Sequence, residues 1–137
     1  MKHSNATMLR FYQHLGRVFH LVVAADKTVR PEETSKLKEI IKAEWLPVDD
    51  TIDEFGEDSA YQIEMVFDWL IENEWDIEQV LPAFKEFKEG NPSIFTEDIK
   101  RLIIKTANAI ANAYNGKNKV ELGVIAQIYL ILTKKNK

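Results

Sequence analysis

Residues 8–23 read MLRFYQHLGRVFHLVV, and this stretch decides the fold. Its large apolar side chains recur every three or four residues: Met8, Phe11, Tyr12, Leu15, Val18, Phe19, Val22 and Val23. That spacing puts them on one wide stripe of an α-helix, sustained over about four turns. Because so wide a stripe must be buried, other elements are expected to pack around it.

The rest of the chain shows the same helical period. Pro31 suits the first turn of a second helix, which Pro47 limits. Further helices are predicted at about 59–72, 76–90, 92–114 (or from 96) and 118–134. The last is apolar almost all round, which predicts a central position. Strand-like alternation is absent over any length, so the sequence predicts an all-α bundle of about six helices in a single domain, residues 1–137.

An offset of 88 residues aligns the two ends of the chain without a gap. The paired positions are Phe11 and Ile99, Leu15 and Ile103, Phe19 and Ala107, Val22 and Ile110, Glu33 and Glu121, Leu37 and Ile125, Ile40 and Ile128, and Ile41 and Tyr129. One interpretation is a coincidence of helical period. The other is an internal duplication, in which two related helical hairpins pack together with the middle helices inserted between them.

Composition and charge exclude several classes of protein. The 137 residues include no cysteine, which excludes disulfides, thiolate metal sites and cysteine nucleophiles. The net charge of −4 disfavours sequence-independent nucleic-acid binding. No apolar run is long enough for a membrane span, and the first residues lack the pattern of a signal peptide. A cytoplasmic location is therefore expected.

Acidic residues are concentrated in the middle of the sequence. No Lys or Arg lies between Ala43 and Phe84. The same window holds thirteen acids: Glu44, Asp49, Asp50, Asp53, Glu54, Glu57, Asp58, Glu64, Asp68, Glu72, Glu74, Asp76 and Glu78. Such segregation favours a surface over residues 49–78 that attracts a basic protein partner or cations. The alternatives are that this segment lies over the basic ends of the same molecule, or forms a solvated face.

The turn after the first helix carries a family likeness. Ala24-Ala25-Asp26, followed by Val29 and Glu33, resembles the tellurite-resistance TerB-like family. The pattern of that family is a helix ending in small residues, an Asp-Gly turn, an aliphatic residue, and a Glu seven residues after the Asp. The likeness is clearest over residues 18–46 and weaker over 102–132, and Lys27 replaces the usual Gly.

The resemblance implies an all-helical, internally duplicated fold, a bacterial stress-linked setting and acidic residues associated with a metal ion. It implies no defined catalytic reaction. In the second half of the chain Tyr114 occupies the place of Asp26 at the 88-residue offset, and only Glu121 remains acidic. The likeness therefore does not extend to a second, equivalent acidic site.

Four carboxylates are the candidate metal ligands: Asp26, Glu32, Glu33 and Glu121. Oxygen ligands of this kind suit hard divalent cations such as Ca²⁺ or Mg²⁺. The alternative is structural: Asp26 caps or braces the turn, and the glutamates complement the dipole of the following helix. Both interpretations stay open at this point.

Aromatic and basic side chains near the acidic segment also have two interpretations. Trp45, Trp69 and Trp75 are expected to pack in the core, whereas an exposed Trp among acids would anchor a partner. His14 lies with Arg10 and Arg17 on a stripe that is expected to face water.

No nucleophile–base motif, Gly-rich phosphate loop or His-Glu-x-x-His pattern occurs, so the chain is not expected to be an enzyme. The leading hypothesis is a TerB-like helical binding module that acts on a protein partner or a divalent cation. The alternative is a metal-dependent enzyme or metal-handling protein that uses the Asp26 and Glu33 cluster. The sequence does not indicate the oligomeric state.

Overall fold

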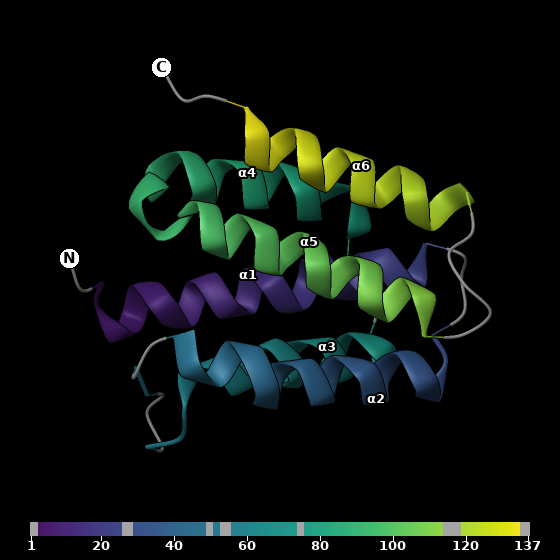
Figure 1. Cartoon of the computed structure of the whole chain (residues 1–137), viewed down its shortest axis with the longest axis horizontal. Coiled ribbons are helices and arrows are strands. Elements are labelled where there is room, and N and C mark those ends of the chain that lie inside the picture. The colour runs from purple at the N-terminus through teal and green to yellow at the C-terminus, as the bar shows by residue number, and fades with distance from the viewer. Residues whose placement is uncertain are drawn as a thin grey trace.

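The apolar stripe of residues 8–23 lies at the centre of the molecule. In the computed structural model this stretch belongs to helix α1 (Asn5–Ala24), which helices α3, α4, α5 and α6 all contact. Figure 1 shows α1 crossing the middle of the bundle, with α2 and α3 on one side and α4 and α6 on the other. The structure describes residues 3–25, 29–48, 51–52, 56–73, 76–113 and 119–134.

The predicted all-α bundle is confirmed, since the described residues form six α-helices and no strand. After α1 come α2 (Pro31–Ile40), the π-helical turn η1 (Ile41–Trp45) and the 3₁₀ turns η2 (Leu46–Val48) and η3 (Ser59–Tyr61). Next are α3 (Gln62–Glu72), η4 (Ile77–Gln79), α4 (Val80–Gly90), η5 (Pro92–Ile94), α5 (Glu97–Asn112) and α6 (Lys119–Thr133). In this part of the chain no helix has the length and hydropathy needed to cross a membrane.

Helix α2 begins where Pro31 predicts, but its α-helical part ends at Ile40, seven residues before Pro47. Pro31 is its first residue, and the Arg30 backbone N–H donates to Glu33 Oε1 at 2.8 Å. This is the backward-reaching bond of a capping box, which supplies a partner for a backbone donor at the helix start. At its other end α2 widens into the π-helical turn η1, which holds Trp45 fully buried before Pro47.

The 88-residue offset holds for the helix boundaries. Helices α1 and α5 end at Ala24 and Asn112, and α2 and α6 begin at Pro31 and Lys119. Several aligned positions are buried in both copies: Leu15 and Ile103, Phe19 and Ala107, Val22 and Ile110, Leu37 and Ile125, and Ile40 and Ile128. Helix α2 packs along α5, and α6 contacts α1, so the second helix of each hairpin lies against the first helix of the other.

One prediction about the packing is wrong. Helix α6 is apolar almost all round but lies at the edge of the bundle, where α1, α4 and α5 cover one side of it (Figure 1). Its other side leaves four large apolar residues exposed: Val120, Leu122, Tyr129 and Leu130. The sequence shows how polar and apolar residues are distributed around a helix, but not how many other helices contact it. Because α1 occupies the centre of the bundle, α6 lies at the edge.

Helices α1 and α3 approach each other closely at Gly16. A β-carbon placed on Gly16 would lie 2.7 Å from the Ile63 carbonyl oxygen and 2.8 Å from Val66 Cβ. Only glycine leaves room for the α3 backbone at this point. This contact fixes the height at which α3 crosses α1 and therefore positions the acidic residues that α3 carries.

Candidate functional site

Part of the acidic segment is neutralised by basic residues from elsewhere in the chain. Lys38 Nζ of α2 lies 3.9 Å from Glu64 Oε2 and 3.6 Å from Asp68 Oδ2 of α3. Lys105 Nζ of α5 donates to Glu44 Oε1 at 2.7 Å. Burial raises the pKa of the Glu64 carboxyl, an effect that Lys38 opposes. The interpretation that basic ends cover the acidic middle is therefore correct for these three acids.

Other acids of the segment are exposed to water and form no ion pair of this kind within the described residues. Glu72 at the end of α3 and Asp76 and Glu78 around η4 are exposed. Among the described residues no Lys or Arg forms an ion pair with any of the three. Asp76 Oδ1 instead accepts from the Glu78 backbone N–H at 3.1 Å, which stabilises the start of η4. Asp49, Asp50, Asp53, Glu54 and Glu74 lie outside the described residues.

The tryptophans have different environments. Trp45 is fully buried, as predicted, and its indole Nε1–H donates to Thr106 Oγ1 at 3.0 Å. Trp69 is 52% exposed on α3, so the prediction of core packing is wrong for this residue. The helical stripe of α3 buries Ile63, Phe67 and Leu70, and Trp69 falls between these positions. Trp75 lies outside the described residues.

A shallow pocket of about 350 Å³ adjoins the exposed indole. It is lined by Arg17 of α1 and by Met65, Val66, Trp69 and Leu70 of α3. Met65 and Ile77 are also about half exposed. We use the name acidic α3 surface for Met65, Trp69 and Glu72 of α3 together with Asp76, Ile77 and Glu78, which follow in sequence around η4. It combines exposed large apolar side chains with exposed carboxylates, and the basic side chain of Arg17 lines the adjoining pocket.

His14 does not lie on a solvated stripe, contrary to expectation. Its ring is half-buried, with its centroid 4.7 Å from that of Phe87 on α4. Burial lowers the pKa of His14 to about 4, and the neighbouring charges of Arg17 and Arg10 act in the same direction. The imidazole is therefore neutral near pH 7 and serves as a packing residue between α1 and α4.

Two of the predicted metal ligands, Glu33 and Glu121, lie at the same end of the bundle. Glu33 and Glu121 occupy the first turns of α2 and α6, and both helices begin at the right-hand end of Figure 1. Both side chains are buried, at 1% and 2% exposure. Glu33 accepts the Arg30 N–H, as the structural interpretation expects, whereas Glu32 is exposed. Asp26 lies outside the described residues, and the remaining part of the chain holds no group of three His, Cys, Asp or Glu placed to bind a metal ion.

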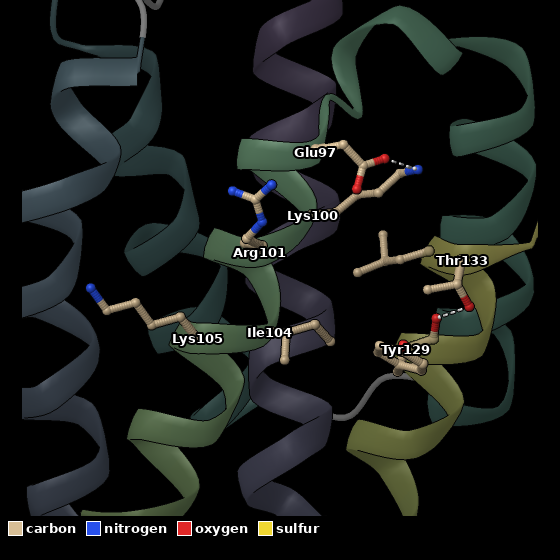
Figure 2. A pocket seen from close by; sticks show the side chains of 8 residues that line it. Glu97, Lys100, Arg101, Ile104, Lys105, Tyr129 and Thr133 are labelled. Carbon is tan, nitrogen blue, oxygen red and sulfur yellow. Dashed lines mark hydrogen bonds and ion pairs between the residues drawn. The ribbon is translucent and has the colours of Figure 1, made fainter.

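Sequence reasoning missed a groove between α5 and α6. Its volume is about 430 Å³, and it is lined by Glu97, Lys100, Arg101, Ile104, Lys105, Tyr129, Leu132 and Thr133 (Figure 2). Lys100, Arg101 and Lys105 recur at helical spacing along α5, and this was the available signal. The groove became recognisable only once α6 was seen at the edge of the bundle.

No protein-family model, no curated protein and no solved structure matches the chain. Its function is therefore inferred from its own residues and their geometry.

Proposed function

We propose that this protein is a non-enzymatic, TerB-like binding module that engages a basic segment of a partner protein through the acidic α3 surface. The observation that carries the proposal is the half-exposed indole of Trp69, three residues before Glu72 on α3. In the described part of the chain, no Lys or Arg forms an ion pair with Glu72, Asp76 or Glu78. Exposed Trp and Met are enriched where proteins bind one another, because large apolar side chains supply most of the binding energy. The carboxylates attract a basic partner and orient it.

The pocket beside Trp69 supports the same proposal. Apart from Arg17, its lining is apolar, and Met65, Val66 and Leu70 are of the kind that accept an aliphatic side chain from a partner. Glu72 lies three residues after Trp69 on α3, and Asp76 and Glu78 follow in sequence around η4. An apolar centre with charged residues near it is typical of protein interfaces.

The proposed membership of the TerB-like family, and with it a stress-related role, rests on the sequence pattern around Val29 and Glu33. The helix boundaries that repeat at the 88-residue offset are in accord with the duplicated fold of that family. No reaction is assigned to the protein.

The test uses a fluorescent synthetic peptide in which Lys and Arg flank Leu on one helical face, titrated with the full chain. We expect the peptide to bind more weakly as the salt concentration is raised from about 0.1 M towards 1 M, because salt screens the attraction between the opposite charges. Trp69→Ala should weaken binding about tenfold or more, as truncation of an anchor residue does. The triple variant Glu72→Gln, Asp76→Asn, Glu78→Gln should weaken it to a similar degree.

The matched control is Glu32→Gln, Glu39→Gln, Glu86→Gln, which removes the same charge from exposed acids on α2 and α4. Binding by this control should be close to that of the unaltered protein. Equal losses in both triple variants would show only a net-charge effect and would contradict the proposed surface.

A second candidate function is divalent-cation binding, in a metal-handling protein or a metal-dependent enzyme. It is favoured by the two buried carboxylates, Glu33 and Glu121, in equivalent first turns at the same end of the bundle. Ca²⁺, Mg²⁺, Mn²⁺ and Zn²⁺ would each be added during thermal unfolding, with chelator as reference. A cation that binds the native state must raise Tm. A rise with one cation that is lost in Asp26→Asn, Glu33→Gln would support this candidate, and no rise with any would dismiss it.

A further inference from the structure

The groove between α5 and α6 has an apolar lining bordered mainly by basic residues. Ile104 of α5 points towards the ring of Tyr129 of α6 (Figure 2), and Leu132 also belongs to the apolar lining. Lys100, Arg101 and Lys105 of α5 line the groove too, together with the acid Glu97. The Lys105 side chain points away from α6 (Figure 2), so Lys100 and Arg101 are the bases nearest to the groove. A concave apolar strip bordered mainly by basic residues is suited to one face of an amphipathic helix.

The outer face of α6 extends this apolar surface. Tyr129 is 55% exposed and Leu130 is 66% exposed, and Leu122 lies two turns earlier on the same helix. A cluster of exposed large apolar residues on one helix is a sign of an interaction site. It adjoins the groove through Tyr129, which belongs to both.

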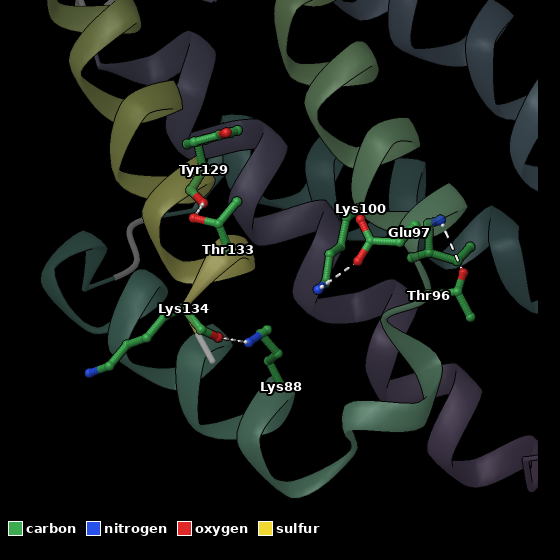
Figure 3. A network of polar contacts seen from close by, with 8 residues as sticks. Lys88, Thr96, Glu97, Lys100, Tyr129, Thr133 and Lys134 are labelled. Carbon is green, nitrogen blue, oxygen red and sulfur yellow. Dashed lines mark hydrogen bonds and ion pairs between the residues drawn. The ribbon is translucent and has the colours of Figure 1, made fainter. Parts of the chain in front are cut away.

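Positive charge accumulates at the same place. Lys88 of α4 and Lys134 lie at the far end of the groove, near Lys100 (Figure 3). The proximity of Lys100 and Lys134 contributes to lowering the pKa of Lys88, although burial is the larger cause. All three lining bases form ion pairs within the chain. Lys100 pairs with Glu97 at 3.4 Å and Arg101 with Asp98 at 3.1 Å, each one helical turn away, whereas Lys105 pairs with Glu44 of η1 at 2.7 Å.

The ion pairs of Lys100 and Arg101 can be exchanged for contacts with a partner. The Glu97 and Asp98 side chains are 76% and 91% exposed, and ion pairs so open to water contribute little to stability. A carboxylate that arrives on a partner and excludes water would compete well for the same bases.

We propose that the groove between α5 and α6 binds an acidic amphipathic helix of a partner protein. Apolar residues of that helix would lie over Ile104, Tyr129 and Leu132, and its Glu or Asp residues would pair with Lys100 and Arg101. The concave shape favours a helix over an anionic membrane, which a flat or convex face contacts more fully. This site shares no residue with the acidic α3 surface and is independent of the function proposed for it.

The test uses a fluorescently labelled peptide of about 18 residues, long enough to form a helix on binding. It carries Leu at positions i, i+3, i+4 and i+7 with Glu beside them, and its control replaces every Glu by Lys. Fluorescence anisotropy with the full chain is expected to show at least about tenfold tighter binding of the Glu peptide. ¹H–¹⁵N spectra should show shifts that are largest at groove residues of α5 and α6.

Two variants remove the two components of the site. Lys100→Gln, Arg101→Gln removes bases that pair only with exposed acids of the same helix, and Tyr129→Ser, Leu130→Ser changes exposed apolar side chains, so both variants should fold. Each is expected to weaken binding of the Glu peptide about tenfold. The matched control Arg10→Gln, Lys42→Gln, which alters exposed bases elsewhere, should bind as the unaltered chain does.

Three results would overturn the proposal. One is equal binding of the Glu and Lys peptides, and another is full binding by both groove variants. The third is evidence that something else occupies the groove. A second copy of the chain would be indicated if sedimentation showed self-association that the groove variants abolish. A membrane would be indicated if the chain bound anionic vesicles but not the peptide. The triple variant of the acidic α3 surface should still bind the Glu peptide, so failure of one proposal can be told from failure of the other.

Discussion

The indole Nε1–H of Trp45 donates a hydrogen bond to Thr106 Oγ1 at 3.0 Å, inside the core and across 61 residues of sequence. Thr106 Oγ1 in turn donates to the Leu102 carbonyl oxygen at 2.8 Å. The Thr106 hydroxyl thus links η1, which follows α2, to α5. Each polar atom in these two hydrogen bonds has a partner. Such a buried network specifies how two helices are placed relative to each other.

Thr106→Val is expected to destabilise the protein by about 1–3 kcal/mol, because it leaves the buried Trp45 donor without an acceptor while keeping the shape of the side chain. Urea unfolding followed by circular dichroism measures the change. Thr106→Ser keeps the hydroxyl and should lose less stability. If the valine variant were as stable as the serine variant, the hydrogen bond would have no net value.

Gly16→Ala should destabilise the native state by about 1–3 kcal/mol, because the new methyl group would meet the Ile63 carbonyl oxygen at 2.7 Å. The control is Gly123→Ala in α6, where a β-carbon meets nothing within 4 Å. Alanine there should stabilise the helix by up to about 1 kcal/mol. Opposite signs of the two changes in Tm would confirm the close approach of α1 and α3, and equal signs would contradict it.

Stability should fall as the pH is lowered from about 6.5 towards 5. In the unfolded chain His14 binds a proton near pH 6.5, but in the native state burial and the charges of Arg17 and Arg10 lower its pKa to about 4. Unfolding therefore takes up protons in this window, and the free energy of unfolding decreases as the pH falls. Burial lowers the pKa of His20 as well, which adds to the effect.

Protonation of His14 at acid pH should lower the free energy of unfolding by about 1–2 kcal/mol in total, after allowance for a side chain that is only half-buried. Denaturation in urea at pH 7, 6 and 5 measures it. His14→Gln should flatten the pH dependence, whereas the control His3→Gln should preserve it. A dependence that is unchanged in His14→Gln would assign the effect to other groups.

Lys88→Met should loosen the end of α6 rather than the whole fold. Lys88 Nζ donates to the Lys134 carbonyl oxygen at 2.9 Å, just beyond the last turn of that helix (Figure 3). Methionine keeps the apolar stem, so the global stability should change by about 1 kcal/mol or less, while amide hydrogens in the last turn of α6 exchange faster. Lys85→Met, on the same helix, is the control. Equal exchange in the two variants would show that Lys88 does not hold α6.

Much of the fold could be predicted from local sequence. Helical period and Pro31 located the start of α2, and the 88-residue offset agrees with the end of α5 and the start of α6. These features depend on residues near one another in sequence. The position of α6 and the exposure of Trp69 depend on how many neighbours each helix has, which is decided by contacts between distant segments.

The candidate site was predictable only in part. The charge pattern located the acidic segment, but it could not show that Lys38 and Lys105 neutralise Glu64, Asp68 and Glu44 while Glu72 stays open to water. The same limit applies to Glu33, whose burial and bond to the Arg30 N–H required the three-dimensional structure. Local patterns indicate which residues carry charge, and packing decides which charges remain available.

The central place of α1 has a consequence for synthesis of the chain. Helix α1 emerges from the ribosome before α5 and α6, two of the helices that cover its apolar stripe. At ordinary rates of translation, roughly ten seconds pass between the first helix and the last. During that interval the apolar stripe of α1 is incompletely covered, which exposes this segment of the nascent protein to aggregation.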